Sequence, residues 1–109
     1  MELVVSTYRV TKSYPDTERY GLVNQLRRAA VSVASNIAEG HARSTGDYVR
    51  HLFIASGSIA EMETQFIASG RLGYLSDSDN KPLLQSCDEL GRMLGALRKS
   101  LRSRRSKTP

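Results

Sequence analysis

The sequence predicts an all-α protein that folds as an antiparallel, up-down-up-down four-helix bundle. Apolar residues recur every three or four positions along most of the chain, and no useful segment shows the two-residue period of a strand. Turns containing proline or glycine separate four such periodic segments. A chain of 109 residues fits one domain. We therefore expect the bundle over residues 1–103 and a basic, disordered tail over residues 104–109.

The first two helices are predicted on either side of a polar turn. Residues 1–14 form a short amphipathic helix, which Pro15 ends because proline disfavours a helical residue before it. The second helix should run from about Arg19 to Glu39, with Gly40 as its stop. The inward face of the first helix is expected to hold Leu3, Val4, Tyr8 and Thr11. The stripe of the second helix consists of Leu22, Leu26, Ala29, Ala30, Val33 and Ile37.

The third and fourth helices carry longer stripes with alternating spacings of four and three. The third is predicted from about Thr45 or Gly46 to Ser69, and the fourth begins after Ser76, a plausible N-cap. Pro82 is awkward inside the fourth helix and suits a first turn better. The third stripe is Tyr48, Leu52, Ala55, Ile59, Met62 and Phe66. The fourth is Leu83, Cys87, Leu90, Leu94, Leu97 and Leu101, which makes the single cysteine a core residue.

The third helix has more apolar surface than one core requires. A second apolar group flanks its main stripe, so the arc reaches about 180° against the roughly 100° that a bundle helix needs. We expect this flank to form an oligomer interface, most economically between copies of the chain. The alternative is a wide groove filled by the chain's own helices. The interface residues predicted on this flank are Val49, Phe53, Ala60 and Ile67.

One carboxylate, that of Glu63, falls inside this apolar arc and needs a partner. Arg27 is the natural cation, since it lies on the corresponding flank of the second helix, and Asn36 also needs partners there. We interpret these three residues as a structural polar network that fixes packing, with a catalytic set as the alternative.

The sequence offers little for catalysis, metals or membranes. A di-iron bundle needs paired Glu-x-x-His spacings, and this chain has none. Asp47 and His51, four residues apart, are more typical of a surface ion pair than of a metal site. No phosphate-binding glycine motif occurs, and we expect no metal and no cofactor. No apolar run is long enough to span a membrane and no signal segment is evident, so we expect a cytoplasmic protein.

The net charge of +5 comes from one end of the chain. Residues 1–97 carry 10 bases and 11 acids, a net charge of −1, whereas the last twelve residues carry six bases and no acid. Such a cluster is a candidate nucleic-acid-binding surface. Alternatively, it only favours the helix dipole and solubility. The candidate residues are Arg98, Lys99, Arg102, Arg104, Arg105 and Lys107.

Three segments of the chain together resemble a known protein family. They are ERYGLVNQLRRAAVSVASNIAEG (18–40), GDYVRHLFIASGSIAEMETQFIASGRLGYLS (46–76) and ELGRMLGALRKSL (89–101). They resemble the four-helix-bundle proteins encoded in 23S rRNA intervening sequences, whose superfamily includes accessory proteins of diversity-generating retroelements. The resemblance implies a homopentameric, cytosolic bacterial protein, with nucleic-acid or ribonucleoprotein binding suggested for the accessory branch. The family-typical positions are Arg27, Arg28, Asn36, Glu39, Gly40, Glu61 and Glu63.

The resemblance and the charge pattern together favour a non-enzymatic, homo-oligomeric protein, a pentamer, that binds RNA, DNA or a ribonucleoprotein. The alternative is a protein–protein interaction scaffold without a nucleic-acid role. An enzyme is the third and least supported class, because no constellation of catalytic residues stands out in the sequence.

Overall fold

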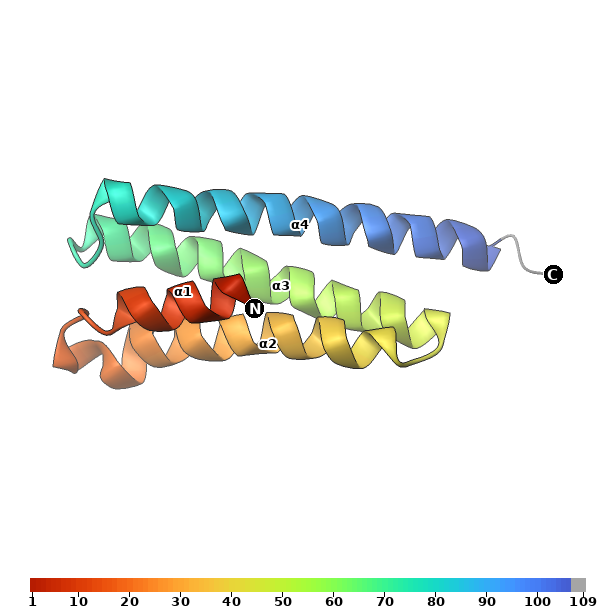
Figure 1. Cartoon of the computed structure of the whole chain (residues 1–109), viewed down its shortest axis with the longest axis horizontal. Helices are drawn as coiled ribbons and strands as arrows, with labels where there is room; N and C mark the ends of the chain where they lie inside the picture. The colour runs from red at the N-terminus through yellow and green to blue at the C-terminus, as the bar shows by residue number, and fades with distance from the viewer. Residues whose placement is uncertain (107–109) are drawn as a thin grey trace.

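A computed structural model describes residues 1–106, with side chains up to Arg104, and shows an elongated all-α chain (Figure 1). The four helices are α1 (Glu2–Thr11), α2 (Asn24–His41), α3 (Thr45–Arg71) and α4 (Asp77–Ser106). Within residues 1–106 there is no strand, so the predicted all-α class is confirmed. No helix in this part of the chain is long and apolar enough to cross a membrane.

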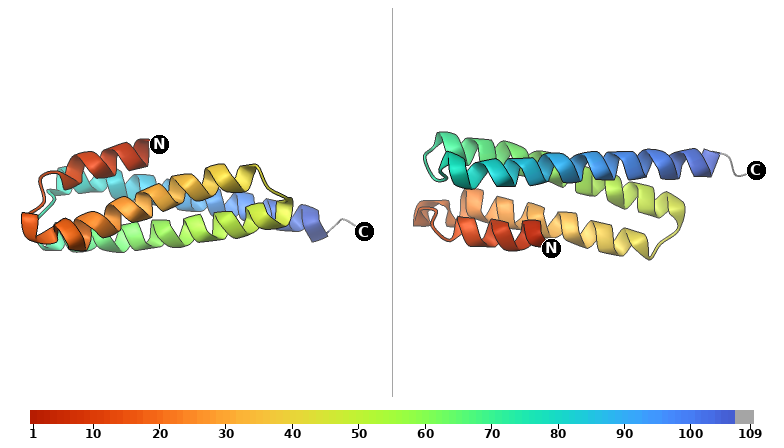
Figure 2. Two further views of the ribbon diagram at one scale, coloured as in Figure 1. Left: turned by 90° about the horizontal axis from the view of Figure 1, so that it is seen from below. Right: turned by 45° about the horizontal axis from the view of Figure 1, so that its top comes forward.

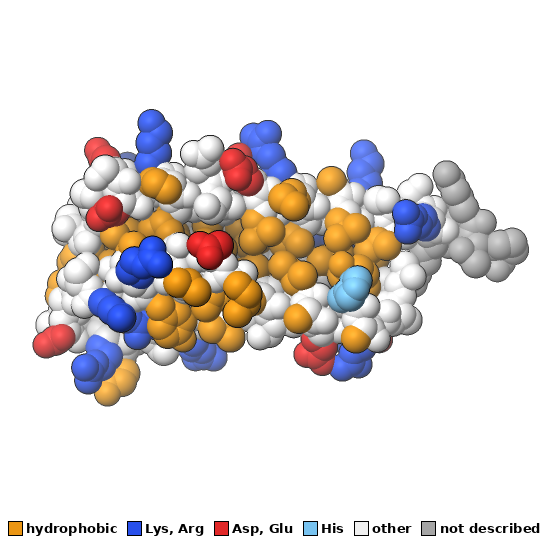
Figure 3. All heavy atoms as spheres, viewed as in Figure 1, with side chains coloured by type: hydrophobic (Ala, Val, Ile, Leu, Met, Phe, Trp, Pro, Cys, Tyr) orange, Lys and Arg blue, Asp and Glu red, His pale blue; other side chains and the backbone are white. Residues whose placement is uncertain are grey.

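The helices pack as neighbours with α3 between α2 and α4. The chain turns back at the loop after α2 and again at the loop after α3 (Figures 1 and 2). The short α1 contacts α2 and α4 near one end of the molecule, and its N-terminus lies near mid-length. Beyond that point only three helices continue, and hydrophobic side chains are visible between α4 and α2 (Figure 3). The bundle is therefore four helices thick at one end only.

The second helix starts later than predicted, at Asn24 instead of about Arg19. Two short turns precede it, a 3-10 turn at Asp16–Glu18 and a π-helical turn at Arg19–Val23. Gly21 causes the break, because its φ of −105° and ψ of −112° are not helical. The carboxylate of Glu18 accepts hydrogen bonds from the backbone N–H of Leu22 and from the hydroxyl of Tyr74, which fastens these turns to the loop after α3.

The fourth helix is continuous through Pro82 and ends later than predicted. Its start is capped by Ser76, whose hydroxyl accepts a hydrogen bond from the N–H of Asp79. Pro82 is the sixth residue of α4 and its ring is exposed, so it lacks one backbone N–H for the second turn but does not end the helix. The helix reaches Ser106, so residues 104–106 are helical and the predicted disordered tail began too early. Serine and arginine sustain a helix at little cost. Residues 107–109, including Lys107, lie outside the described residues.

The core contains most of the predicted stripe residues. Leu26, Leu52, Met62, Phe66 and Cys87 have no solvent-exposed surface. Two predictions are wrong. Leu97 is 38% exposed, and on α1 Thr7 is buried together with the predicted Thr11, whereas Tyr8 is 39% exposed. The hydroxyls of Thr7 and Thr11 donate to backbone carbonyls one turn earlier, so these polar groups can be buried in α1.

Candidate nucleic-acid interface

The basic end of α4 lies at the tip of the molecule. In Figures 1 and 2, α4 extends past the loop that joins α2 to α3. Lys99, Arg102 and Arg104 are exposed there and Arg98 is half-buried. At about 100° per residue, Arg98, Arg102 and Lys99 point to one side of the helix and Arg104 points to the other. The side chain of Arg105 is outside the described part of the chain, as is Lys107.

Arg98 connects two of the predicted sites. Its guanidinium carbon lies 5.1 Å from the centroid of the Phe53 ring on α3, a cation–π contact. Phe53 itself is 65% exposed, and Arg98 covers only part of it. Arg98 is therefore partly occupied by its contact with the apolar flank of α3.

The predicted interface residues remain outside the core. Phe53, Ala60 and Ile67 are exposed and Val49 is half-buried, although their neighbours on the main stripe are fully buried. If the chain's own helices filled the extra arc, these residues would be covered. The flank of α3 is thus an apolar surface of the single chain, and an external partner is the remaining way to bury it.

The predicted polar network of Arg27, Asn36 and Glu63 does not form. Arg27 and Asn36 are nine residues apart on α2, which at about 100° per residue places them on opposite faces. The Nε of Arg27 donates to the hydroxyl of Thr11 at 2.9 Å, toward α1. Asn36 instead faces α3. Glu63 is half-buried and close enough to the Cys87 thiol to affect its pKa, so it lies on the α4 side.

A different polar network joins α2 and α3. The Nδ1–H of His51 donates to Oδ1 of Asn36 at 2.9 Å, because the amide nitrogen of Asn36 donates to the carbonyl of Ser32 at 2.8 Å. The hydroxyl of Ser58 donates to that of Ser32 at 3.0 Å. His51 is only 7% exposed, so the predicted surface ion pair with Asp47 is wrong. Gly40, one turn after Asn36, leaves the space that the His51 side chain occupies.

Sequence reasoning missed this network because its members come from two helices. The available signal was on α2, where Ser32, Asn36 and Gly40 recur every four residues and so share one face. Small and polar residues at such a spacing indicate close helix contact. Their partner on the facing helix could not be chosen from the sequence.

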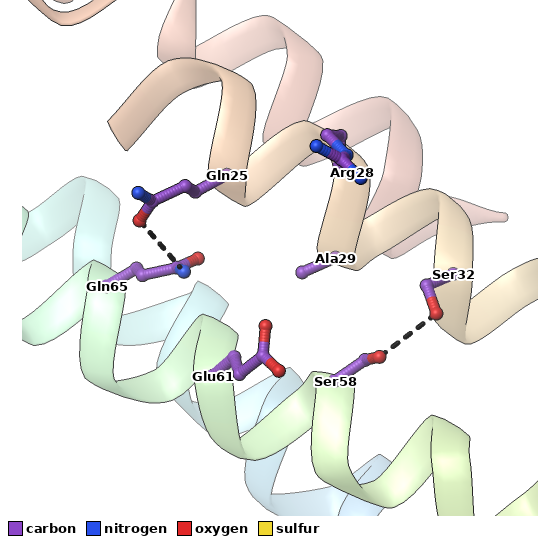
Figure 4. A pocket seen from close by; sticks show the side chains of 7 residues that line it. All are labelled: Gln25, Arg28, Ala29, Ser32, Ser58, Glu61 and Gln65. Carbon is purple, nitrogen blue, oxygen red and sulfur yellow. Dashed lines mark hydrogen bonds between the residues drawn. The ribbon is translucent and has the colours of Figure 1, made fainter. Parts of the chain in front are cut away.

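Beside this network lies an open groove of about 500 Å³ between α2 and α3 (Figure 4). Gln25 and Gln65 meet across one end, with Nε2 of Gln65 donating to Oε1 of Gln25 at 3.4 Å. Glu61 projects from α3 into the space, and Arg28 lies on the α2 side without an ion pair to it (Figure 4). Among the described residues, no group of three or more His, Cys, Asp or Glu side chains could hold a metal ion.

The thiol of Cys87 is expected to react very slowly with thiol reagents in the folded protein. Burial, with a smaller contribution from the nearby carboxylate of Glu63, raises the pKa of its thiol from 9.0 to about 11. The thiolate is the reactive form, so a thiol reagent at pH 8 should label unfolded protein rapidly and folded protein only at its opening rate. Because the unfolded chain ionises first, the thiol's contribution to stability should fall as pH rises from about 9 to 11. Fast labelling of folded protein would contradict this burial, and Cys87→Ala is the control.

Comparison with known proteins points to one family. The profile described as 23S rRNA-intervening sequence protein matches residues 1–96, which include α1, α2, α3 and the first part of α4 and stop just before its basic end. No curated protein sequence matches the chain significantly. The match agrees with the resemblance of the three quoted segments.

Proposed function

Because the chain belongs to the 23S rRNA-intervening sequence protein family, we propose that it is a cytoplasmic, non-enzymatic protein that assembles as a homopentamer and binds RNA, DNA or a ribonucleoprotein. The observation that carries the binding part is the basic end of α4. After Glu89 the chain contains no acid, and the basic residues lie along the last turns of a helix that extends beyond its neighbours.

The charge pattern supports contacts to phosphates rather than to bases. Lysine and arginine that neutralise phosphates release counterions, and this gives affinity without sequence specificity. No aromatic residue follows Tyr74, so stacking on bases is not expected at this end. Several copies of the basic end on one particle would bind a polyanion much more tightly than one copy, through effective concentration.

The apolar flank of α3 supports the assembly part of the proposal. Phe53 and Ile67 are 65% and 49% exposed, and further apolar side chains are exposed between α2 and α4 beyond α1 (Figure 3). Burying such surface stabilises an assembly by about 25 cal/mol per Å² before association costs are subtracted.

Neutralising the basic end is expected to weaken nucleic-acid binding about tenfold or more and to flatten its salt dependence. Arg98, Lys99, Arg102, Arg104, Arg105 and Lys107 are all replaced by glutamine. Substitution is better than deletion because Leu101, buried within the segment, packs on the core. The measurement is fluorescence anisotropy with single-stranded RNA and duplex DNA at about 0.05 and 0.2 M salt. Unchanged affinity would remove the basic end from the site, and no binding by the unmodified protein would reject the binding function.

The Phe53→Glu variant is expected to dissociate the particle toward the 12.1 kDa single chain. A carboxylate buried in an apolar interface has a large desolvation cost. In the free chain, by contrast, the new carboxylate would face Arg98 and water, so folding should be preserved. Light scattering gives the mass and circular dichroism the helicity. Tyr20→Glu, at an 86% exposed site in the turn before α2, is the matched control. A particle of unchanged mass would show that Phe53 is outside the interface.

The second candidate is a protein-interaction scaffold, which the exposed flank of α3 favours. It predicts that assembly persists and that neither RNA nor DNA binds at low salt. The anisotropy titrations with RNA and with DNA therefore separate this scaffold from the first candidate.

A further inference from the structure

A second basic surface lies at the opposite part of the molecule, between α1 and α2. A groove of about 590 Å³ is lined there by two arginines, three polar or aromatic side chains with hydrogen-bonding groups, and one valine. These residues are Tyr8, Asn24, Arg27, Arg28, Val31 and Ser32. No carboxylate is among them. In Figure 3, Lys and Arg side chains gather over α1 and the start of α2.

The basic surface continues around the end of α1. A smaller hollow of about 230 Å³ shares Arg27 with the groove and adds Lys12 and Arg19. Its lining includes a single acid, Asp16. Four cations from α1, the turn and α2 thus line two adjoining hollows, although residues 1–97 have a net charge of −1. Folding has concentrated charge that is scattered in the sequence.

Arg27 is held in place by uncharged groups. Its guanidinium carbon lies 4.6 Å from the centroid of the Tyr8 ring, and its Nε donates to Thr11 at 2.9 Å. One terminal nitrogen reaches the carbonyl of Tyr8 at 3.5 Å. In the described part of the chain neither Arg27 nor Arg28 forms an ion pair with a carboxylate; Glu61 lines the α2–α3 groove together with Arg28. A positioned, uncompensated guanidinium is suited to bidentate contact with an anion.

We propose that this groove binds the phosphodiester backbone of a nucleic acid, as a site separate from the basic end of α4. The guanidinium groups of Arg27 and Arg28 would contact phosphates, and Asn24 would donate a further hydrogen bond. The apolar surfaces of Val31 and Tyr8 fit a sugar or base beside them. The lack of a lining carboxylate favours a polyanion over a protein partner, whose surface usually carries both signs of charge. The inference rests on the proposed function for the class of ligand.

The test uses the full chain with the six glutamines already placed in the basic end. Arg28→Gln is added to that background, because Arg28 is exposed and makes no hydrogen bond or ion pair in the structure. Arg50→Gln, an exposed arginine on α3, has the same change in charge and is the control. Anisotropy with labelled single-stranded RNA should show about fivefold weaker binding for Arg28→Gln, with the salt slope lower by about one, and no comparable loss for Arg50→Gln.

The remaining outcomes separate this site from the proposed function. If the unmodified protein binds RNA and the six-glutamine background does not, the groove proposal fails while the function stands. If neither binds, both fail. Equal losses of RNA affinity in Arg28→Gln and Arg50→Gln would show that only the overall charge matters, and this would overturn the groove proposal. A lower particle mass for Arg28→Gln would reassign the groove to a contact between copies. Displacement of RNA by equimolar inorganic phosphate would identify a free-anion site instead of a backbone site. Arg27→Lys keeps the positive charge but loses the paired N–H groups of the guanidinium. Weaker RNA binding by this variant would support the proposed phosphodiester site.

Discussion

Replacing Phe66 with alanine is expected to lower the free energy of unfolding by about 3–5 kcal/mol. Phe66 is a large, fully buried side chain in the C-terminal half of α3, the helix that packs between α2 and α4. Replacing the ring loses its transfer free energy and leaves a cavity. Because α3 is packed between α2 and α4, the surrounding side chains can fill this cavity only in part. Urea unfolding followed by circular dichroism measures the change.

The chain contains a matched control for this substitution. Phe53 is the only other phenylalanine, it lies on the same helix, and it is 65% exposed. Phe53→Ala removes the same atoms from a surface site, so it should change the unfolding free energy of the single chain by less than about 1 kcal/mol. Both variants are compared at a concentration where light scattering shows single chains, because Phe53 belongs to the proposed interface and assembly would add to the measured stability. Equal losses in the two variants would contradict the burial of Phe66.

Replacing Gly40 with alanine is expected to destabilise the protein by about 1–3 kcal/mol, although alanine is the better helix former. A Cβ at position 40 would lie 2.7 Å from Cβ of His51 and 3.0 Å from Cδ1 of Tyr48. The Cβ of His51 is attached directly to the backbone and cannot be moved by a rotamer change, so α2 and α3 must separate. The hydrogen bond between His51 and Asn36 would lengthen as they do.

Gly57→Ala on α3 tests the explanation. A Cβ at position 57 meets no atom within 4 Å, so only helix propensity acts, and the variant should be more stable by up to about 1 kcal/mol. Thermal and urea unfolding of the two variants should therefore shift in opposite directions. A stabilised Gly40→Ala protein would show that α2 and α3 are not in close contact at this point. The measurement also tests the His51 network, since Gly40 provides its space.

Helix positions were predictable because the apolar period of an amphipathic helix depends only on residues that are close together in the sequence. The stripe of α3 from Leu52 to Phe66 is buried as its spacing predicts. The predictions failed where another local interaction outweighed the apolar period. Gly21 broke the start of α2, and on α1 the hydroxyl of Thr7 bonded its own helix, which allowed it to replace Tyr8 in the core.

The polar and charged sites depended on partners that the sequence does not pair. Arg27 was expected beside Glu63, yet it contacts Tyr8 and Thr11 on α1. Its actual partners are 16 and 19 residues away along the chain and become neighbours only when α1 folds back on α2. The basic groove also cannot be recognised from the composition, because acids elsewhere in the chain cancel its positive charge in the net charge of residues 1–97.

The sequence by itself determined the all-α class, the approximate helix positions, most of the core, the family resemblance and the basic end of α4. These features follow from side chains close together along the chain, where helical geometry relates spacing directly to direction. Tertiary structure decided the pairing of His51 with Asn36 and the grouping of Lys12, Arg19, Arg27 and Arg28 at one surface. Such contacts join separate segments, and their partners are set by how the helices pack against one another.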